Sequence, residues 1–123
     1  MTGALAAIAG SSGVFITGGT ASVSGVGPVA APGTSIANTG VASIGTVYNA
    51  VPPATYLWEH VSGETATVNS PTSSSTTFTR SVLVLPGEFF ELSGVYRCKV
   101  TDSAGQVAYG RLCYVNTSHF DNT

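Results

Sequence analysis

The chain has little charge. Of its 123 residues, 8% are charged, against about 25% in ordinary soluble domains. No Asp, Glu, Lys, Arg or His precedes Glu59, so all of the charge lies from Glu59 onward. The formal net charge is −2, which gives no basic surface for nucleic acid or for an anionic membrane. We therefore expect no nucleic-acid partner. The uncharged segment before Glu59 indicates either a flexible arm or a surface that a partner or sister subunits cover.

Long apolar runs and helical periodicity are missing as well. The first ten residues contain no basic residue, and glycine interrupts their apolar stretch. They match neither a secretory signal nor a membrane span, so we expect no membrane insertion. No window places apolar residues at i, i+3, i+4 and i+7 between helix caps. Short apolar runs separated by Gly, Pro and Ser clusters instead predict an all-β sandwich.

Groupings of catalytic or metal-ligating residues are also lacking. Glu88 and Glu91 flank an expected surface crossing between strands, where carboxylates are normally solvated, and a helical turn is expected there. His60 is expected at the rim of the sandwich, and His119 lies in an expected polar tail. The three serines at 73–75 lack the G-x-S-x-G pattern of a hydrolase nucleophile. We therefore expect no enzyme, no catalytic residue, no cofactor and no metal ion.

The most informative stretch is an expected β-hairpin near the C-terminus. Alternating residues before Asp102 are apolar, which puts one face of a strand into a core. Asp102 opens the turn, where its side chain caps backbone amides, and Gly105 supplies the positive φ that a three-residue loop needs. This loop sets Val100 opposite Ala108. The same register continues as Cys98 opposite Gly110 and Tyr96 opposite Leu112, with Ala108, Gly110, Leu112 and Tyr114 pointing inward.

This register separates the two cysteines. Cys98 is expected to point inward and Cys113 outward. Side chains on opposite faces of one hairpin cannot meet the geometry of a disulfide. Both are therefore expected to be free thiols, as in a protein that folds in a reducing compartment.

A family resemblance follows from these residues. The stretch Gly94–Cys98 reads G-V-Y-R-C and resembles the G-x-Y-x-C signature of strand F in immunoglobulin-like domains. Trp58, forty residues earlier, resembles the buried tryptophan of strand C. The family's strand B cysteine is absent, since the chain offers only Ile44 and Val47 there. The resemblance implies a tyrosine corner at Tyr96. It also implies an immunoglobulin-like antiparallel β-sandwich of about seven strands with Greek-key connections, without the inter-sheet disulfide.

The expected organisation has three parts. An uncharged Gly/Ala/Ser-rich N-terminal arm covers 1–33, the immunoglobulin-like sandwich 34–116, and a polar C-terminal tail 117–123. In the sandwich, Arg80 breaks the alternation of its strand, which indicates either a bulge or a place at the rim. The expected structural core is Trp58, Phe78, Tyr96, Cys98, Val100 and Leu112. The residues of the arm that are expected to bind a partner are Val14, Phe15, Ile16, Val23 and Val26.

The resemblance also suggests a function. The hydroxyl-rich strands and the hairpin are similar to immunoglobulin-like modules on virion proteins of tailed bacteriophages. The hypothesis is a non-enzymatic virion structural protein, a capsid decoration or cement protein that folds in the host cytoplasm. Its arm would bind the major capsid protein or another virion protein. A symmetric homo-oligomer, such as a trimer, would agree with the low charge and the arm.

Two alternatives stay open. The protein could be an immunoglobulin-like component of a phage tail or fibre. It could also be an adhesion module that binds carbohydrate, for example a host-surface glycan. Four tyrosines could supply aromatic platforms for such a glycan, although the simpler interpretation places most of them in the core; they are Tyr48, Tyr56, Tyr109 and Tyr114.

Overall fold

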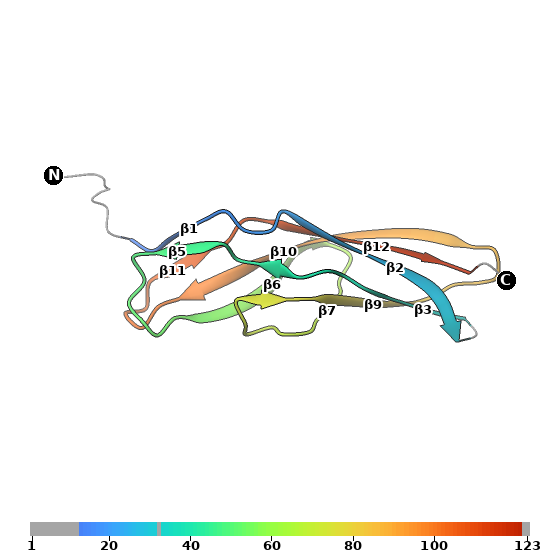
Figure 1. Ribbon diagram of the computed structural model, residues 1–123, viewed down its shortest axis with the longest axis horizontal. Helices are drawn as coiled ribbons and strands as arrows, with labels where there is room; N and C mark the ends of the chain where they lie inside the picture. The colour runs from blue at the N-terminus through green and yellow to red at the C-terminus, as the bar shows by residue number, and fades with distance from the viewer. Residues whose placement is uncertain (1–12, 32, 122–123) are drawn as a thin grey trace.

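The computed structural model describes residues 13–31 and 33–121, and all the regular structure in these ranges is β-strand. Figure 1 shows an elongated body in which the described chain starts near one end and finishes near the other. Within the described ranges, no helix could cross a membrane. The strands are β1 (Phe15–Thr17), β2 (Ser22–Ala31), β3 (Thr34–Asn38), β4 (Ala42–Ser43), β5 (Thr46–Tyr48), β6 (Thr55–Gly63), β7 (Thr67–Val68), β8 (Ser75–Thr76), β9 (Phe78–Leu83), β10 (Phe89–Thr101), β11 (Val107–Tyr109) and β12 (Cys113–Phe120).

The strands form an immunoglobulin-like β-sandwich. One sheet has the order β6, β10, β12 and β2, with β11 beside the end of β10, and the other has the order β2, β3, β9 and β7. Strand β2 belongs to both: its first part pairs in parallel with β12, and its last part pairs antiparallel with β3. Two short ladders, β1 with β5 and β4 with β8, extend the body. The expected all-β sandwich is therefore confirmed.

Aromatic side chains join the two sheets. Phe78 on β9 packs edge-on against Trp58 of β6, with ring centroids 5.9 Å apart, and its ring lies 4.9 Å from that of Tyr96 on β10. The Tyr96 hydroxyl donates a hydrogen bond to the carbonyl of Ala66 and accepts one from its amide. The tyrosine thus anchors the backbone before β7. Of the six expected core residues, five are buried: Trp58, Phe78, Tyr96, Cys98 and Val100.

Leu112 is the expected core residue that the structure corrects. The hairpin register is confirmed as far as Gly110, whose amide donates to the carbonyl of Cys98, and Gly105 has φ +85°. Beyond this point one extra residue lies outside the ladder, so Tyr96 pairs with Cys113 rather than with Leu112. A shift of one residue exchanges the two faces of a strand. Cys113 is therefore buried, whereas Leu112 is 45% exposed.

The first half of the chain also differs from the expectation. The described residues between 15 and 31 form strands of the sandwich rather than a separate arm. Val23 belongs to the core, and the side chain of Ile16 packs against it. The glycines of β2 serve close packing: a Cβ on Gly25 would overlap the backbone of Asn38 on β3. From composition alone, these glycines predicted a flexible arm. In the structure they let β2 pass from one sheet to the other.

The segments near Glu88 and after 116 are likewise strands. β10 begins at Phe89, where a helical turn was expected, and β12 continues to Phe120, where a polar tail was expected. Residues 122 and 123 lie outside the described ranges. His119 is fully buried. The period of two in β12 continues past 116, with odd-numbered residues inward and even-numbered residues outward.

Arg80 takes neither of the two expected places. Its strand runs without a register shift against β3, and Arg80 points inward and is buried. Its guanidinium donates to four backbone carbonyls and one hydroxyl: those of Glu64, Thr65, Leu92, Val115 and Thr117. A buried cation needs this degree of satisfaction. Burial still lowers the pKa of Arg80 from its ordinary value.

Candidate binding site

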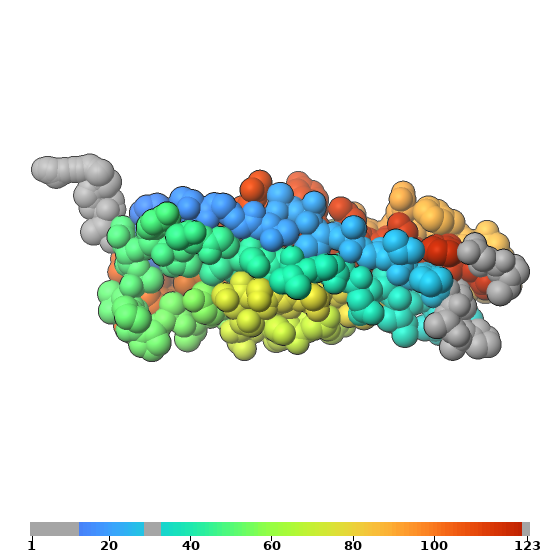
Figure 2. All heavy atoms as spheres, viewed as in Figure 1, coloured from blue at the N-terminus to red at the C-terminus, as the bar shows by residue number. Residues whose placement is uncertain are grey.

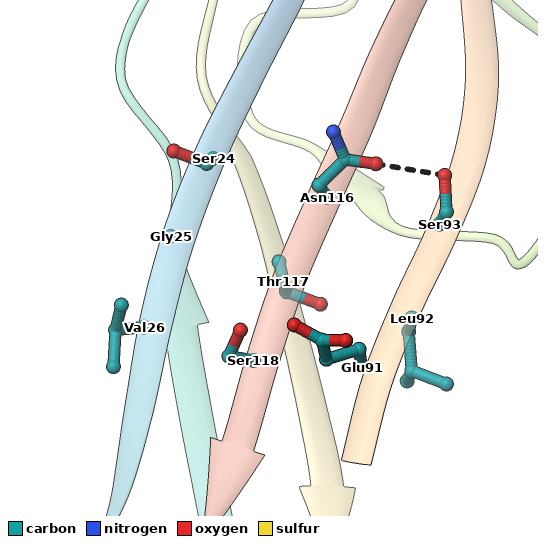
Figure 3. Close-up of a pocket in the computed structure, with 9 residues that line it drawn as sticks. All are labelled: Ser24, Gly25, Val26, Glu91, Leu92, Ser93, Asn116, Thr117 and Ser118. Atoms are coloured by element: carbon teal, nitrogen blue, oxygen red, sulfur yellow. Dashed lines mark hydrogen bonds between the residues drawn. The ribbon is translucent and has the colours of Figure 1, made fainter.

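The register of three neighbouring strands builds a polar surface on the outside of the sandwich. Strands β10, β12 and β2 lie side by side, and their outward side chains form rows across the sheet. Two of these rows line a hollow, shown in Figure 3 with its lining residues, which we call the polar hollow. A third row, next to Glu91, ends the surface with aromatic rings. The rows are Ser93–Asn116–Ser24, Glu91–Ser118–Val26 and Phe89–Phe120–Pro28.

Hydrogen bonding in the polar hollow leaves several groups free. The Ser93 hydroxyl donates to Oδ1 of Asn116 over 2.7 Å, which orients the amide (Figure 3). In the described part of the chain, neither the amide nitrogen of Asn116 nor the carboxylate of Glu91 has a hydrogen-bond partner. In Figure 3 the Glu91 side chain extends across the sheet toward Ser118. The hollow thus presents a carboxylate acceptor and amide and hydroxyl donors.

The interior behind the hollow is polar and linked by hydrogen bonds. Thr117 points inward from β12, where its Oγ1 accepts a hydrogen bond from Arg80 Nη1 at 3.0 Å. The same oxygen lies 2.8 Å from Nε2 of His119. Ser35 on β3 lies 2.8 Å from the other ring nitrogen of His119 and donates to the carbonyl of Gly27. These bonds tie β12 to both sheets and hold the outer rows in place.

Aromatic residues flank the polar hollow along the strands. The rings of Phe89 and Phe120 stack with centroids 6.5 Å apart and planes inclined by 24°. Phe89 is 61% exposed. At the other end of the rows, Tyr114 lies opposite Val95 and is also exposed. The outward side chains of β12 are therefore aromatic at both ends, Tyr114 and Phe120, and polar between them.

The opposite end of the body carries a second aromatic surface. Phe15 of β1 and Tyr48 of β5 stack with centroids 4.9 Å apart, and both are partly exposed. Nearby on β10, the guanidinium of Arg97 lies 3.9 Å from the centre of the Tyr109 ring. Of the four tyrosines considered as platforms, Tyr56 alone packs against the core. The expectation that most of them pack inside is wrong.

The expected partner-binding residues are thus divided. Phe15 and Val26 are exposed, Val14 and Ile16 are half-buried, and Val23 is in the core. Phe15 and Val26 lie in different regions, one in the stack at the start of the chain and the other in the polar hollow. Sequence reasoning missed Asn116 and Ser118 because it ended the last strand too early. The sequence signal that could have revealed them is the alternation of inward odd-numbered and outward even-numbered residues, which continues to Phe120.

Neither cysteines nor acidic residues form a metal site in the described ranges, where no group of three His, Cys, Asp or Glu side chains comes together. Asp102 caps the hairpin as expected: its Oδ1 accepts from the amides of Ala104 and Gln106, and its Oδ2 from the amide of Val51. The bond from Val51 is the main cause that lowers the pKa of Asp102. The role of this carboxylate is therefore structural.

Comparisons with known proteins give a limited result. No family model matches the chain, and no curated protein matches it. Among solved structures, the chain is similar to the N-terminal domain of PorA, with a TM-score of 0.48 and 10% sequence identity. That alignment covers 86% of this chain and 95% of that chain.

Proposed function

We propose that this protein is a non-enzymatic virion structural protein, a capsid decoration or cement protein that folds in the host cytoplasm. In this role it binds the major capsid protein or another virion protein and displays its immunoglobulin-like sandwich on the capsid surface. The observation that carries the proposal is the exposed stack of Phe15 and Tyr48 at the end of the body where the described chain starts. The virion is suggested by the hydroxyl-rich strands and the hairpin at 98–105, which resemble immunoglobulin-like modules on virion proteins of tailed bacteriophages.

The start of the chain favours attachment through this end. Twelve uncharged residues precede the described structure here. Val51, Val107 and Tyr109 are exposed, and Figure 1 places β5 and β11 beside β1. Clustered apolar side chains on a surface mark interaction sites. An uncharged segment can add to a partner through backbone hydrogen bonds and apolar burial, without ion pairs.

The attachment segment that we propose is shorter than the expected arm. Residues 22–31 pair with β12 and with β3, so their backbone is not free to add as a strand to a neighbouring subunit. Attachment is therefore proposed for residues 1–17 together with Tyr48, in place of the whole stretch 1–33. Figure 2 shows the elongated body, whose far end would then point away from the capsid.

The first test is quantitative mass spectrometry of the particle, expressed as copies of this chain per major capsid protein. A ratio of one, or a simple fraction of it, is expected for a protein that decorates the capsid lattice. A ratio of a few per cent would move the protein to the tail or a fibre. Absence from the particle would overturn the virion proposal.

A pair of variants tests the attachment surface. The double variant Phe15→Ser, Tyr48→Ser removes the exposed stack and is expected to lose most of its retention on the particle. Leu83→Ser is the matched control, because Leu83 is even more exposed but lies at the far end of β9. Thermal unfolding of both proteins checks that they are folded. Equal retention of the two folded variants would refute attachment through this end.

A further inference from the structure

We infer that the polar hollow on β10, β12 and β2 is a binding site for a neutral glycan, meaning an uncharged oligosaccharide. The inference concerns the purified chain and does not rest on the virion proposal. The ligand class follows from three properties of the surface: its size, its free hydrogen-bonding groups and its flanking rings.

The size is set by the sheet. Neighbouring strands lie about 4.8 Å apart and alternate residues of one strand about 7 Å apart. Three strands and three rows therefore offer a surface of about 10 by 14 Å, which suits one or two sugar rings. Strand β12 extends this surface to Tyr114, in line with Asn116 and Ser118. An oligosaccharide could thus lie along β12.

The free polar groups match the hydroxyls of a sugar. Each sugar hydroxyl both donates and accepts, so an oligosaccharide that lies along β12 needs acceptors and donors in successive rows. Glu91 is an acceptor when ionised, and the Asn116 amide nitrogen has two N–H groups. Ser93 already fixes the orientation of that amide. Groups that are held in place before binding lose less entropy when the ligand arrives.

The charge of the hollow selects against ions. Glu91 is its only ionisable lining residue, so an anionic ligand would be repelled. A divalent cation needs several oxygen ligands of suitable charge, and within the described chain no cluster of acidic or histidine side chains accompanies Glu91. Arg80 lies behind the sheet, bonded to Thr117 and to backbone carbonyls. A neutral polyhydroxyl ligand is the class that satisfies the remaining groups.

The aromatic row suits the apolar face of a sugar ring. A pyranose ring has C–H groups that pack against an aromatic face, while its hydroxyls project sideways. The stacked rings of Phe89 and Phe120 lie in the row next to Glu91 and Ser118. A sugar could therefore contact the rings and the carboxylate together. This combination of a few placed polar groups with apolar contact is typical of ligand sites.

The test is a titration of the full chain by calorimetry and by NMR with neutral trisaccharides: maltotriose, cellotriose and N-acetylchitotriose. Binding of at least one of them is expected. Glu91→Ala, Asn116→Ala and Phe89→Ala should each weaken it by about tenfold or more. Glu59→Ala is the matched control. Glu59 lies on the same sheet opposite Arg97, outside the hollow, and its loss should leave the affinity unchanged.

Two results would overturn the inference. One is the absence of heat and of chemical-shift change with all three sugars at millimolar concentration. The other is equal weakening by Glu91→Ala and Glu59→Ala. NMR spectra of every variant establish that it is folded, and the exposed positions of Glu91 and Phe89 make this expected. Because no particle is involved, failure here is distinguishable from failure of the virion proposal.

Discussion

Arg80 donates a hydrogen bond from Nη1 to Oγ1 of Thr117, 3.0 Å away, inside the sandwich. The bond links β9 of one sheet to β12 of the other. The same guanidinium donates to backbone carbonyls of β10, β12 and the segment before β7. One cation thus joins the carbonyls of two neighbouring strands to the segment before β7.

Replacing Arg80 by Met should destabilise the protein strongly. The variant keeps apolar length but removes the five hydrogen bonds that the guanidinium donates, and we expect a loss of about 3 kcal/mol in the free energy of unfolding. Arg97→Met is the control. Arg97 lies at the surface over Tyr109, so its loss should cost about 1 kcal/mol or less. Urea denaturation measures both, and similar losses would contradict the role assigned to Arg80.

His119 should make the fold sensitive to acid. Ser35 donates to the Gly27 carbonyl, so its oxygen accepts from Nδ1–H of His119. Thr117 accepts from Arg80 and donates to Nε2. This chain of bonds requires a neutral imidazole. Burial, followed by the charge of Arg80, lowers the pKa of His119.

The sign of the effect follows from this pKa. As the pH falls, the unfolded chain takes up the proton first, at a pKa of about 6.5. The free energy of unfolding therefore keeps its full value above that pH and decreases as the pH drops below it. Unfolding free energies measured between about pH 5 and 7.5 should show this slope. His119→Gln should remove most of it, whereas His60→Gln, at an exposed site, should retain it. A slope that depends on His60 instead would disprove the assignment.

Local chemistry in the sequence predicted the hairpin. Gly105 and Asp102 define the loop, and the loop fixes Val100 opposite Ala108, as observed. The interior positions of Trp58 and Tyr96 followed from alternation and from the family pattern. These features depend on neighbouring residues, which a sequence displays directly.

Long-range features could not be predicted in the same way. Around the start of β12 both sets of alternate residues are apolar, Leu112 and Tyr114 against Cys113 and Val115. Hydrophobicity therefore could not locate the extra residue before Cys113. The polar hollow depends on the parallel pairing of β2 with β12, and the small residues of β2 gave no sign of that partner.

Gly94 should tolerate no side chain. A Cβ there would overlap the carbonyl oxygen of Glu64 and lie 2.9 Å from Nη2 of Arg80. Gly94→Ala should therefore cost about 2–3 kcal/mol through overpacking. Gly110→Ala is the control, because its Cβ would meet nothing closer than 3.6 Å and its cost should stay within about 0.5 kcal/mol. Thermal and urea unfolding of the two variants would show whether the glycine of the G-x-Y-x-C signature is required by this contact.

The two cysteines provide a chemical test of the register. Both are 1% exposed and free. Burial raises the pKa of the Cys98 thiol to about 11 and also raises that of Cys113. The reactive thiolate is thus scarce and covered, so in the folded protein neither cysteine should react with Ellman's reagent faster than the chain opens. Leu112→Cys introduces a thiol at an exposed neighbouring position, and this thiol should react at once. Rapid reaction of Cys113 in the unaltered, folded chain would instead place it on the outer face and restore the register in which Tyr96 pairs with Leu112.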